Sequence, residues 1–236
     1  MLLKAWLWGS RGRRNVMRAV RPLGPVSATL AQYAPGGSFV DVGAIWSVHG
    51  KIAFAAEELG ATSVTAVDVS PETPEYEAEH KRRGSAVRFV QGDIHAPATI
   101  EAIGPHDTVW CSGVLYHCPN PAHTIDCLRS ITRKRLVLIT ASVPEVPGVR
   151  NAGVFFPGLG ESERKAYDRA YNAASNIPAA RLGLTTPFDP AEEYGNWFWG
   201  LSPSAIEAML QASGFAVEET KTNGFHTRVV ARLEGA

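Results

Sequence analysis

The sequence lacks three features that would each indicate a particular class of protein. No apolar run approaches the roughly 18 residues of a membrane-spanning helix, so we predict no transmembrane segment. The 236 residues include three cysteines, Cys111, Cys118 and Cys127, and this small, odd number favours a reducing, cytoplasmic location over a disulfide framework. Lys and Arg number 23, as do Asp and Glu, which excludes a strong overall field for nucleic acid or membranes.

The charges are nevertheless unevenly distributed. Residues 1–40 carry basic side chains and no acidic one. We predict that residues 1–35 form a basic amphipathic helical leader, with Pro35-Gly36-Gly37 as its boundary. Trp6 and Trp8, followed by arginines, could give this leader a weak contact with an anionic membrane surface or with phosphate groups, or the leader could simply cap the domain.

Apolar runs and helical patterns alternate along the chain from residue 36 to residue 141. Strands separated by helices of about ten residues predict right-handed crossovers and a parallel sheet covered on both faces. We therefore expect an α/β fold with a mostly parallel, Rossmann-like sheet. The predicted strands lie at 38–42, 63–68, 86–90, 107–111 and 135–140, and the predicted helices at 49–59, 74–83, 98–103 and 120–130.

The alternation stops between residues 142 and 195. This stretch is rich in proline, glycine and aromatic residues and contains one predicted helix, at 161–175. So long an insertion indicates a helical lid or substrate-binding cap. Alternation then resumes with a helix at 202–214 and a hairpin with strands at 215–220 and 225–233. The predicted core thus comprises residues 36–141 and 196–236, and residues 142–195 form the lid insertion.

Acidic and small residues follow the predicted strands, at the edge where an open parallel sheet binds its ligand. Asp41 could accept a hydrogen bond from an ammonium group, and Gly43 would let the backbone turn beside a ligand. Asp68 is placed to accept from ribose hydroxyls and Asp93 from an adenine amine. The loop from Gly43 to Gly50 lacks the second and third glycines of the dinucleotide fingerprint, which argues against a ligand with a pyrophosphate.

Four motifs follow one another in a specific order: Val40-Asp41-Val-Gly-Ala44, Val64-Thr-Ala-Val-Asp68, Phe89-Val-Gln-Gly-Asp93 and Asp107 to His117, the last ending in Gly-Val-Leu-Tyr-His. Together they resemble the class I S-adenosylmethionine-dependent methyltransferases, and the last motif is similar to that of relatives of the tRNA wobble-uridine carboxymethyl transferase. The resemblance implies a seven-stranded sheet with an antiparallel last strand and S-adenosyl-L-methionine as cofactor. The implied cofactor-binding residues are Asp41, Gly43, Ala44, Asp68, Val69, Gly92, Asp93, Ile94, Cys111, Ser112 and Gly113.

The sequence departs from this family pattern in two respects. The usual glycine-rich loop is replaced by Ala44-Ile-Trp-Ser47, and the turn before the following helix is about three residues longer than the family pattern implies. The charged side chains expected of the enzyme that uses a carboxylated cofactor are not identifiable.

Histidines are the candidate general bases, because their pKa suits proton removal near neutral pH. His117 is the first choice, since it lies just past the fourth strand, where the methyl group should point. His49, in the cofactor loop, is the second choice, and His226, in the last strand, is the third. No metal site is predicted, because the spacing of Cys118 and Cys127 around a histidine supplies no fourth ligand.

Aromatic residues are the candidate substrate-binding groups: Trp46, Tyr116, Trp197 and Trp199 could form a stacking wall for a sugar or an aromatic acceptor. The leading hypothesis is therefore O-methylation of a small molecule or a glycan hydroxyl. Two alternatives remain: an RNA-modifying methyl or carboxymethyl transferase of the wobble-uridine type, and a cofactor-binding module without catalysis. The residues do not indicate an oligomeric state.

Overall fold

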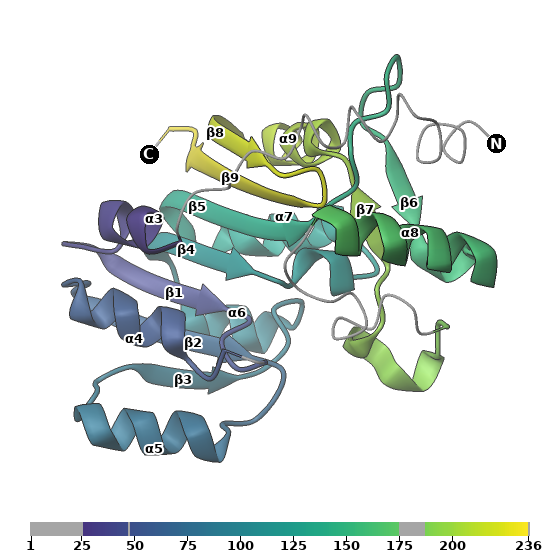
Figure 1. Ribbon diagram of the computed structural model, residues 1–236. Helices are drawn as coiled ribbons and strands as arrows, with labels where there is room; N and C mark the ends of the chain where they lie inside the picture. The colour runs from purple at the N-terminus through teal and green to yellow at the C-terminus, as the bar shows by residue number, and fades with distance from the viewer. Residues whose placement is uncertain (1–25, 47, 175–186, 236) are drawn as a thin grey trace.

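A seven-stranded sheet organises the molecule (Figure 1). The computed structural model describes residues 26–46, 48–174 and 187–235. The strands follow the order β3-β2-β1-β4-β5-β9-β8; the first five run parallel, and β9 runs antiparallel to both of its neighbours. This confirms the predicted α/β fold with its antiparallel last strand. The strands are β1 Ser38–Val42, β2 Ser63–Asp68, β3 Arg88–Gln91, β4 His106–Ser112, β5 Thr132–Ala141, β8 Phe215–Thr222 and β9 His226–Leu233.

Helices cover both faces of the sheet, as expected for strands that are apolar on both sides. On one face, Phe39 and Trp110 pack in a core with side chains of α3, α4 and α5. On the other, Val40 and Val109 pack with side chains of α6, α7 and α9. The helices are α3 Val26–Tyr33, α4 Lys51–Glu58, α5 Pro74–Arg83, α6 Pro97–Ile103, α7 Pro121–Ser130 and α9 Pro203–Ala212.

Three of these helices begin with a side-chain cap followed by proline. Thr73, Asn120 and Ser202 each accept a hydrogen bond from the amide three residues on, at the start of α5, α7 and α9. Such caps satisfy amides that have no partner within the helix, and proline fits the first helical position because its missing N–H is not needed there. The predicted helix start at Asn120 is thus confirmed.

The predicted insertion folds into short elements beyond the end of the sheet toward which the β1 and β4 arrows point (Figure 1). Its helix α8, Glu161–Ala174, matches the predicted one within the described residues. Strand β6, Gly153–Phe155, pairs antiparallel with β7, Trp199–Leu201, in a second sheet that the sequence did not predict. Three-residue strands are too short to show an alternating pattern. A 3-10 turn, η2 Phe156–Gly158, follows β6, and another, η4 Pro190–Gly195, precedes β7.

The basic part of the predicted leader, residues 1–25, lies outside the described residues. Its last segment forms α3, whose Leu30 is buried in the core. In the part of the chain that the structure describes, no helix combines the length and apolar character needed to cross a membrane.

Two glycines with a left-handed backbone, Gly50 and Gly60, flank α4 in the crossover from β1 to β2. Substituting them compares how tightly the two ends of this helix are packed. An added Cβ at Gly50, with φ 76°, would lie 2.5 Å from the ring of the buried Tyr76, whereas at Gly60, with φ 90°, no described atom lies within 4 Å. Both alanine substitutions should cost about 1–2 kcal/mol for the backbone conformation, and Gly50→Ala about 1–3 kcal/mol more for overpacking. Urea unfolding of the two variants measures the difference; equal losses would contradict this packing.

Candidate active site

A cavity of about 480 Å³ opens at the carboxyl ends of the parallel strands. It is bordered by the ends of β1, β2, β4 and β5, by the loops after β3 and β4, by the start of β9 and by Tyr194 of η4. Neighbouring parallel strands end at the same edge of a sheet, which is why residues far apart in sequence meet here. The predicted site residues that line the cavity are Asp41, Gly43, Trp46, Asp68, Val69, Gly92, Asp93, Ile94, Ser112, Gly113, Tyr116, His117 and His226.

Asp41 is a buried carboxyl group whose Oδ2 has no hydrogen-bond partner among the described residues. Burial raises its pKa to about 7; the backbone amide of Ala53 opposes this shift, and the nearby Asp68 adds to it. A buried, half-satisfied carboxylate is costly in a folded protein unless a cation pairs with it. Asp41 is therefore suited to receive a positively charged group in the cavity.

Asp68, at the end of β2, is held by the backbone around it. Its Oδ2 accepts a hydrogen bond from the Ile45 amide at 2.8 Å, and its Oδ1 accepts one from the Ser70 amide at 2.8 Å. Each carboxylate oxygen has a second lone pair. The side chain can thus accept from a pair of hydroxyls without giving up the contacts that orient it.

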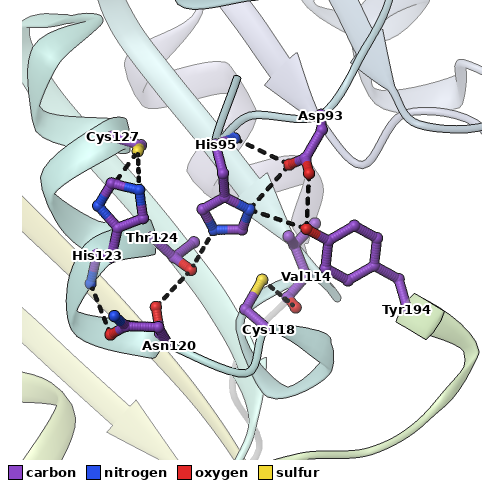
Figure 2. A network of polar contacts seen from close by, with 9 residues as sticks. All are labelled: Asp93, His95, Val114, Cys118, Asn120, His123, Thr124, Cys127 and Tyr194. Atoms are coloured by element: carbon purple, nitrogen blue, oxygen red, sulfur yellow. Dashed lines mark hydrogen bonds and ion pairs between the residues drawn. The ribbon is translucent and has the colours of Figure 1, made fainter. Parts of the chain in front are cut away.

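Asp93 belongs to a network of polar side chains, shown in Figure 2. Its Oδ2 accepts from the Tyr194 hydroxyl at 2.7 Å, and its Oδ1 lies 2.8 Å from His95 Nδ1. Burial alone would raise the pKa of Asp93, but the hydrogen bonds from the His95 amide and from Tyr194 lower it overall. Asp93 is thus a carboxylate with at least one lone pair left for a donor in the cavity.

The far nitrogen of His95 extends this network to α7. His95 Nε2 lies 2.8 Å from the Thr124 hydroxyl, which itself donates to the Asn120 carbonyl. Each ring nitrogen of His95 therefore lies within hydrogen-bond distance of a side-chain oxygen. The network connects β3, α7 and η4, and it fixes the position of Asp93.

His117 lies in the loop after β4, where it lines the cavity. Its Nδ1 donates to the Asn196 carbonyl at 2.8 Å, because a carbonyl can only accept. Burial lowers the pKa of His117 to about 4, although the bond to Asn196 opposes this shift. The ring is therefore neutral near neutral pH, with its proton on Nδ1 and a lone pair on Nε2. Its face stacks on Trp46, with ring centroids 5.6 Å apart.

Asn196 is in turn fixed by a clamp of its own. Its side-chain nitrogen donates to the carbonyls of Asp189 and Glu193, and its side-chain oxygen accepts from the Asp189 amide. These bonds hold a loop in which Glu193 has an unusual φ of 41°. The geometry at His117 thus depends on the segment that closes the insertion.

Comparison with known proteins indicates the family of the segment that carries most of these cavity residues. Residues 40–139 match the family model described as a methyltransferase domain. Within these matched residues the chain carries a methyltransferase domain. No curated protein sequence matches the chain.

Solved structures share the fold of this chain at low sequence identity. The N-terminal domain of EvdMO1, with S-adenosylhomocysteine bound, is 15% identical, covers 88% of this chain and 79% of its own, and has a TM-score of 0.59. The 1,6-didemethyltoxoflavin-N1-methyltransferase of Burkholderia thailandensis is 17% identical, with coverage of 98% and 84% and a TM-score of 0.58. Magnesium protoporphyrin IX methyltransferase of Synechocystis PCC 6803 is 18% identical, with coverage of 95% and 95% and a TM-score of 0.54.

Five predicted site residues do not line the cavity. His49 lies in the loop before α4 but outside the cavity, with its Nδ1 3.0 Å from the Thr73 hydroxyl. Ala44 and Cys111 are completely buried, Ala44 in the core beside α4 and Cys111 in the core beside α7. Trp197 packs behind Tyr116, with centroids 4.4 Å apart, and Trp199 donates to the Pro119 carbonyl and packs on Phe155.

Sequence reasoning also missed residues that the fold brings to the cavity, notably His95, Tyr194, Thr140 and Ala141. His95 follows Asp93 by two residues and could have been noticed as a local partner. Tyr194 could not, because nothing in its neighbourhood indicates a contact with β3. No group of three metal-ligating His, Cys, Asp or Glu side chains occurs in the residues that the structure describes.

The raised pKa of Asp41 predicts a pH-dependent cost to the free protein. A group whose pKa rises from 3.8 to about 7 on folding stabilises the fold below pH 3.8, and this contribution disappears as the pH rises through 7. Asp41→Asn should therefore be more stable than the wild type at pH 8, by at most about 4 kcal/mol, and should lose this advantage at pH 4. Thermal unfolding of both proteins across this range tests the sign; an advantage that grows at low pH would contradict it.

Proposed function

We propose that the protein transfers a methyl group from S-adenosylmethionine to a hydroxyl of a neutral small molecule or glycan, with His117 as general base. The observation that supports this most directly is the state of His117. It is a half-buried, neutral imidazole that lines the cavity, and its Nε2 has no hydrogen-bond partner among the described residues. The second support is the character of the cavity, which places three acids at one end and neutral polar and aromatic groups at the other.

The acids would hold the cofactor. Asp68 would accept from the ribose hydroxyls, Asp93 from the adenine amine and Asp41 from the ammonium of the amino-acid portion. The Oδ2 of Asp41 fits this role, because it is buried without a hydrogen-bond partner among the described residues and would gain a cationic one. Bound there, the cofactor supplies an activated methyl group on a sulfonium sulfur.

His117 would receive the acceptor's proton. As the oxygen–methyl bond forms and the sulfur–methyl bond breaks, the hydroxyl proton would pass to Nε2, and the bond from Nδ1 to the Asn196 carbonyl would stabilise the imidazolium. Because the ring is neutral well below pH 7, the lone pair is available throughout the neutral range. Tyr116 and Trp46 would orient the acceptor beside it, which supplies much of the acceleration in a displacement of this kind.

The nature of the acceptor follows from the charges that the cavity has and lacks. Among the described residues, no lysine or arginine lines it. A phosphate or carboxylate on the acceptor would therefore find no cation, beside three acids that repel it. We infer a neutral acceptor, with residues 142–195 as the lid that closes over it.

The three free cysteines agree with a cytoplasmic location.

The same lack of cations bears on the RNA-modifying alternative, which would need partners for phosphates or for a carboxylated cofactor. The basic leader that could supply them falls at residues 1–25, outside the described residues. Activity that falls steeply as salt rises would favour this alternative, because phosphate contacts release counterions. A protein that binds S-adenosylmethionine but transfers no methyl group in any screen would favour the non-catalytic module.

Substitution of the two candidate bases discriminates between them. His117→Phe keeps the stacking on Trp46 but removes the base, so kcat should fall about 10²–10⁴-fold, with S-adenosylmethionine affinity retained. His49→Ala should keep kcat within about threefold, because this side chain does not line the cavity. A tritiated-methyl transfer screen over phenols, sugars, lipids and tRNA, followed by kinetics on the best acceptor, measures both; the reverse ranking would overturn the assignment of His117.

Cofactor affinity should depend on pH through Asp41. The ammonium requires the ionised carboxylate, whereas in the free protein Asp41 holds a proton below about pH 7. Binding of S-adenosylhomocysteine should therefore weaken by up to about tenfold per pH unit below 7 and should release a proton near pH 6. Calorimetry in two buffers with different ionisation enthalpies measures that proton. Asp41→Asn should bind weakly at every pH without proton release.

A further inference from the structure

A second, half-buried histidine borders the cavity and takes no part in the proposed proton transfer. His226 begins β9, which pairs with β5, so that His226 lies opposite Ala141. His226, Thr140 and Ala141 all line the cavity. Since β5 lies between β4 and β9, the cavity has His117 on its β4 side and His226 on its β9 side.

The ring of His226 is held by the predicted lid. Its Nε2 lies 2.7 Å from the hydroxyl of Tyr171 on α8. Tyr171 is almost completely buried and packs edge-on against Trp197 and Phe225. Burial lowers the pKa of His226, so the imidazole is neutral and has one donor and one acceptor nitrogen. With Nε2 committed to Tyr171, Nδ1 is the nitrogen without a hydrogen-bond partner in the described part of the chain.

Few polar groups are left to recognise an acceptor at this end of the cavity. The Thr140 hydroxyl donates to the Ala141 carbonyl and is therefore already engaged. His117 bonds Asn196 through Nδ1, and His226 bonds Tyr171 through Nε2. The second ring nitrogen of each histidine has no hydrogen-bond partner among the described residues. Two aromatic side chains that line the cavity contact His117: Tyr116, with ring centroids 4.1 Å apart, and Trp46, which stacks on the imidazole.

We propose that His226 binds a second oxygen of an aromatic acceptor whose reacting hydroxyl meets His117. This rests on the proposed function and deepens it: the acceptor is a neutral, planar phenol with a neighbouring hydroxyl or carbonyl. A hydroxyl satisfies Nδ1 in either tautomer, because it both donates and accepts. Flat aromatic walls favour a planar ring. A phenol is also a better match than a sugar for a weakly basic imidazole, since its proton is easier to remove.

The test measures binding without methyl transfer. Catechol, phenol and methyl glucoside are titrated by NMR into the full-length protein saturated with S-adenosylhomocysteine. The wild type should bind catechol about tenfold more tightly than phenol, the effect of one added hydrogen bond. His226→Phe should remove this preference and leave phenol affinity within about twofold. His226→Asn, whose amide places a polar atom near the position of Nδ1, should restore part of the preference.

The proposal would be overturned by an equal loss of affinity for catechol and phenol in His226→Phe, or by a preference for catechol that survives this substitution. Binding of methyl glucoside in place of catechol would also overturn it. Thermal unfolding and S-adenosylhomocysteine affinity establish that each variant is folded. Should His226→Phe not fold, Tyr171→Phe replaces it; loss of the hydroxyl frees the imidazole to turn, and the catechol preference should fall at least threefold. Failure of the proposed function has a different signature, namely retained catechol binding with no methyl transfer, or transfer that survives His117→Phe.

Discussion

The hydrogen bond from His117 to the Asn196 carbonyl is the contact on which the proposed catalytic half of the site depends. It decides which nitrogen of a half-buried, neutral imidazole carries the proton, and hence which one would face a substrate. It also joins two parts of the chain 79 residues apart, the loop after β4 and the end of the insertion. Because the Asn196 side chain is held by bonds to the backbone of Asp189 and Glu193, the position of the proposed base depends on the fold of the insertion as well as on β4.

The same principle recurs along the cavity. Tyr194 bonds Asp93 at the end proposed for adenine, and Tyr171 bonds His226 at the opposite side. Residues from the insertion thus hold the side chains that the strand ends present. Charge follows a matching division: the acids follow β1, β2 and β3, where a cofactor with a sulfonium and an ammonium would lie, and the neutral histidines border β4 and β9. The carboxylates of Asp41 and Asp68 repel each other, and the cationic groups of the proposed cofactor would offset this repulsion.

Much of the fold could be predicted because it is written in local patterns. The limits of β1, β2 and α5 coincide with the predicted ones, since apolar runs end at Asp or Gly, and α5 begins at Thr73-Pro74. The predicted limits of β3 and β5 differ from the observed ones by a few residues. The edge strand β3 extends to the polar Gln91, and β5 begins with the polar residues 132–135. The pairing of β6 with β7 was missed because strands this short are stabilised by their partner alone.

For the site, the sequence by itself determined which side chains follow the strands, because chain order and the parallel sheet bring Asp41, Asp68 and Asp93 to one edge. Only the tertiary structure decided the rest. It separated His117 from His49, which turns toward Thr73, and it brought His226 and Tyr194 to the same cavity. The physical reason is distance along the chain: hydrogen bonds between residues 55 to 101 positions apart depend on how the insertion packs, and no local pattern records that packing.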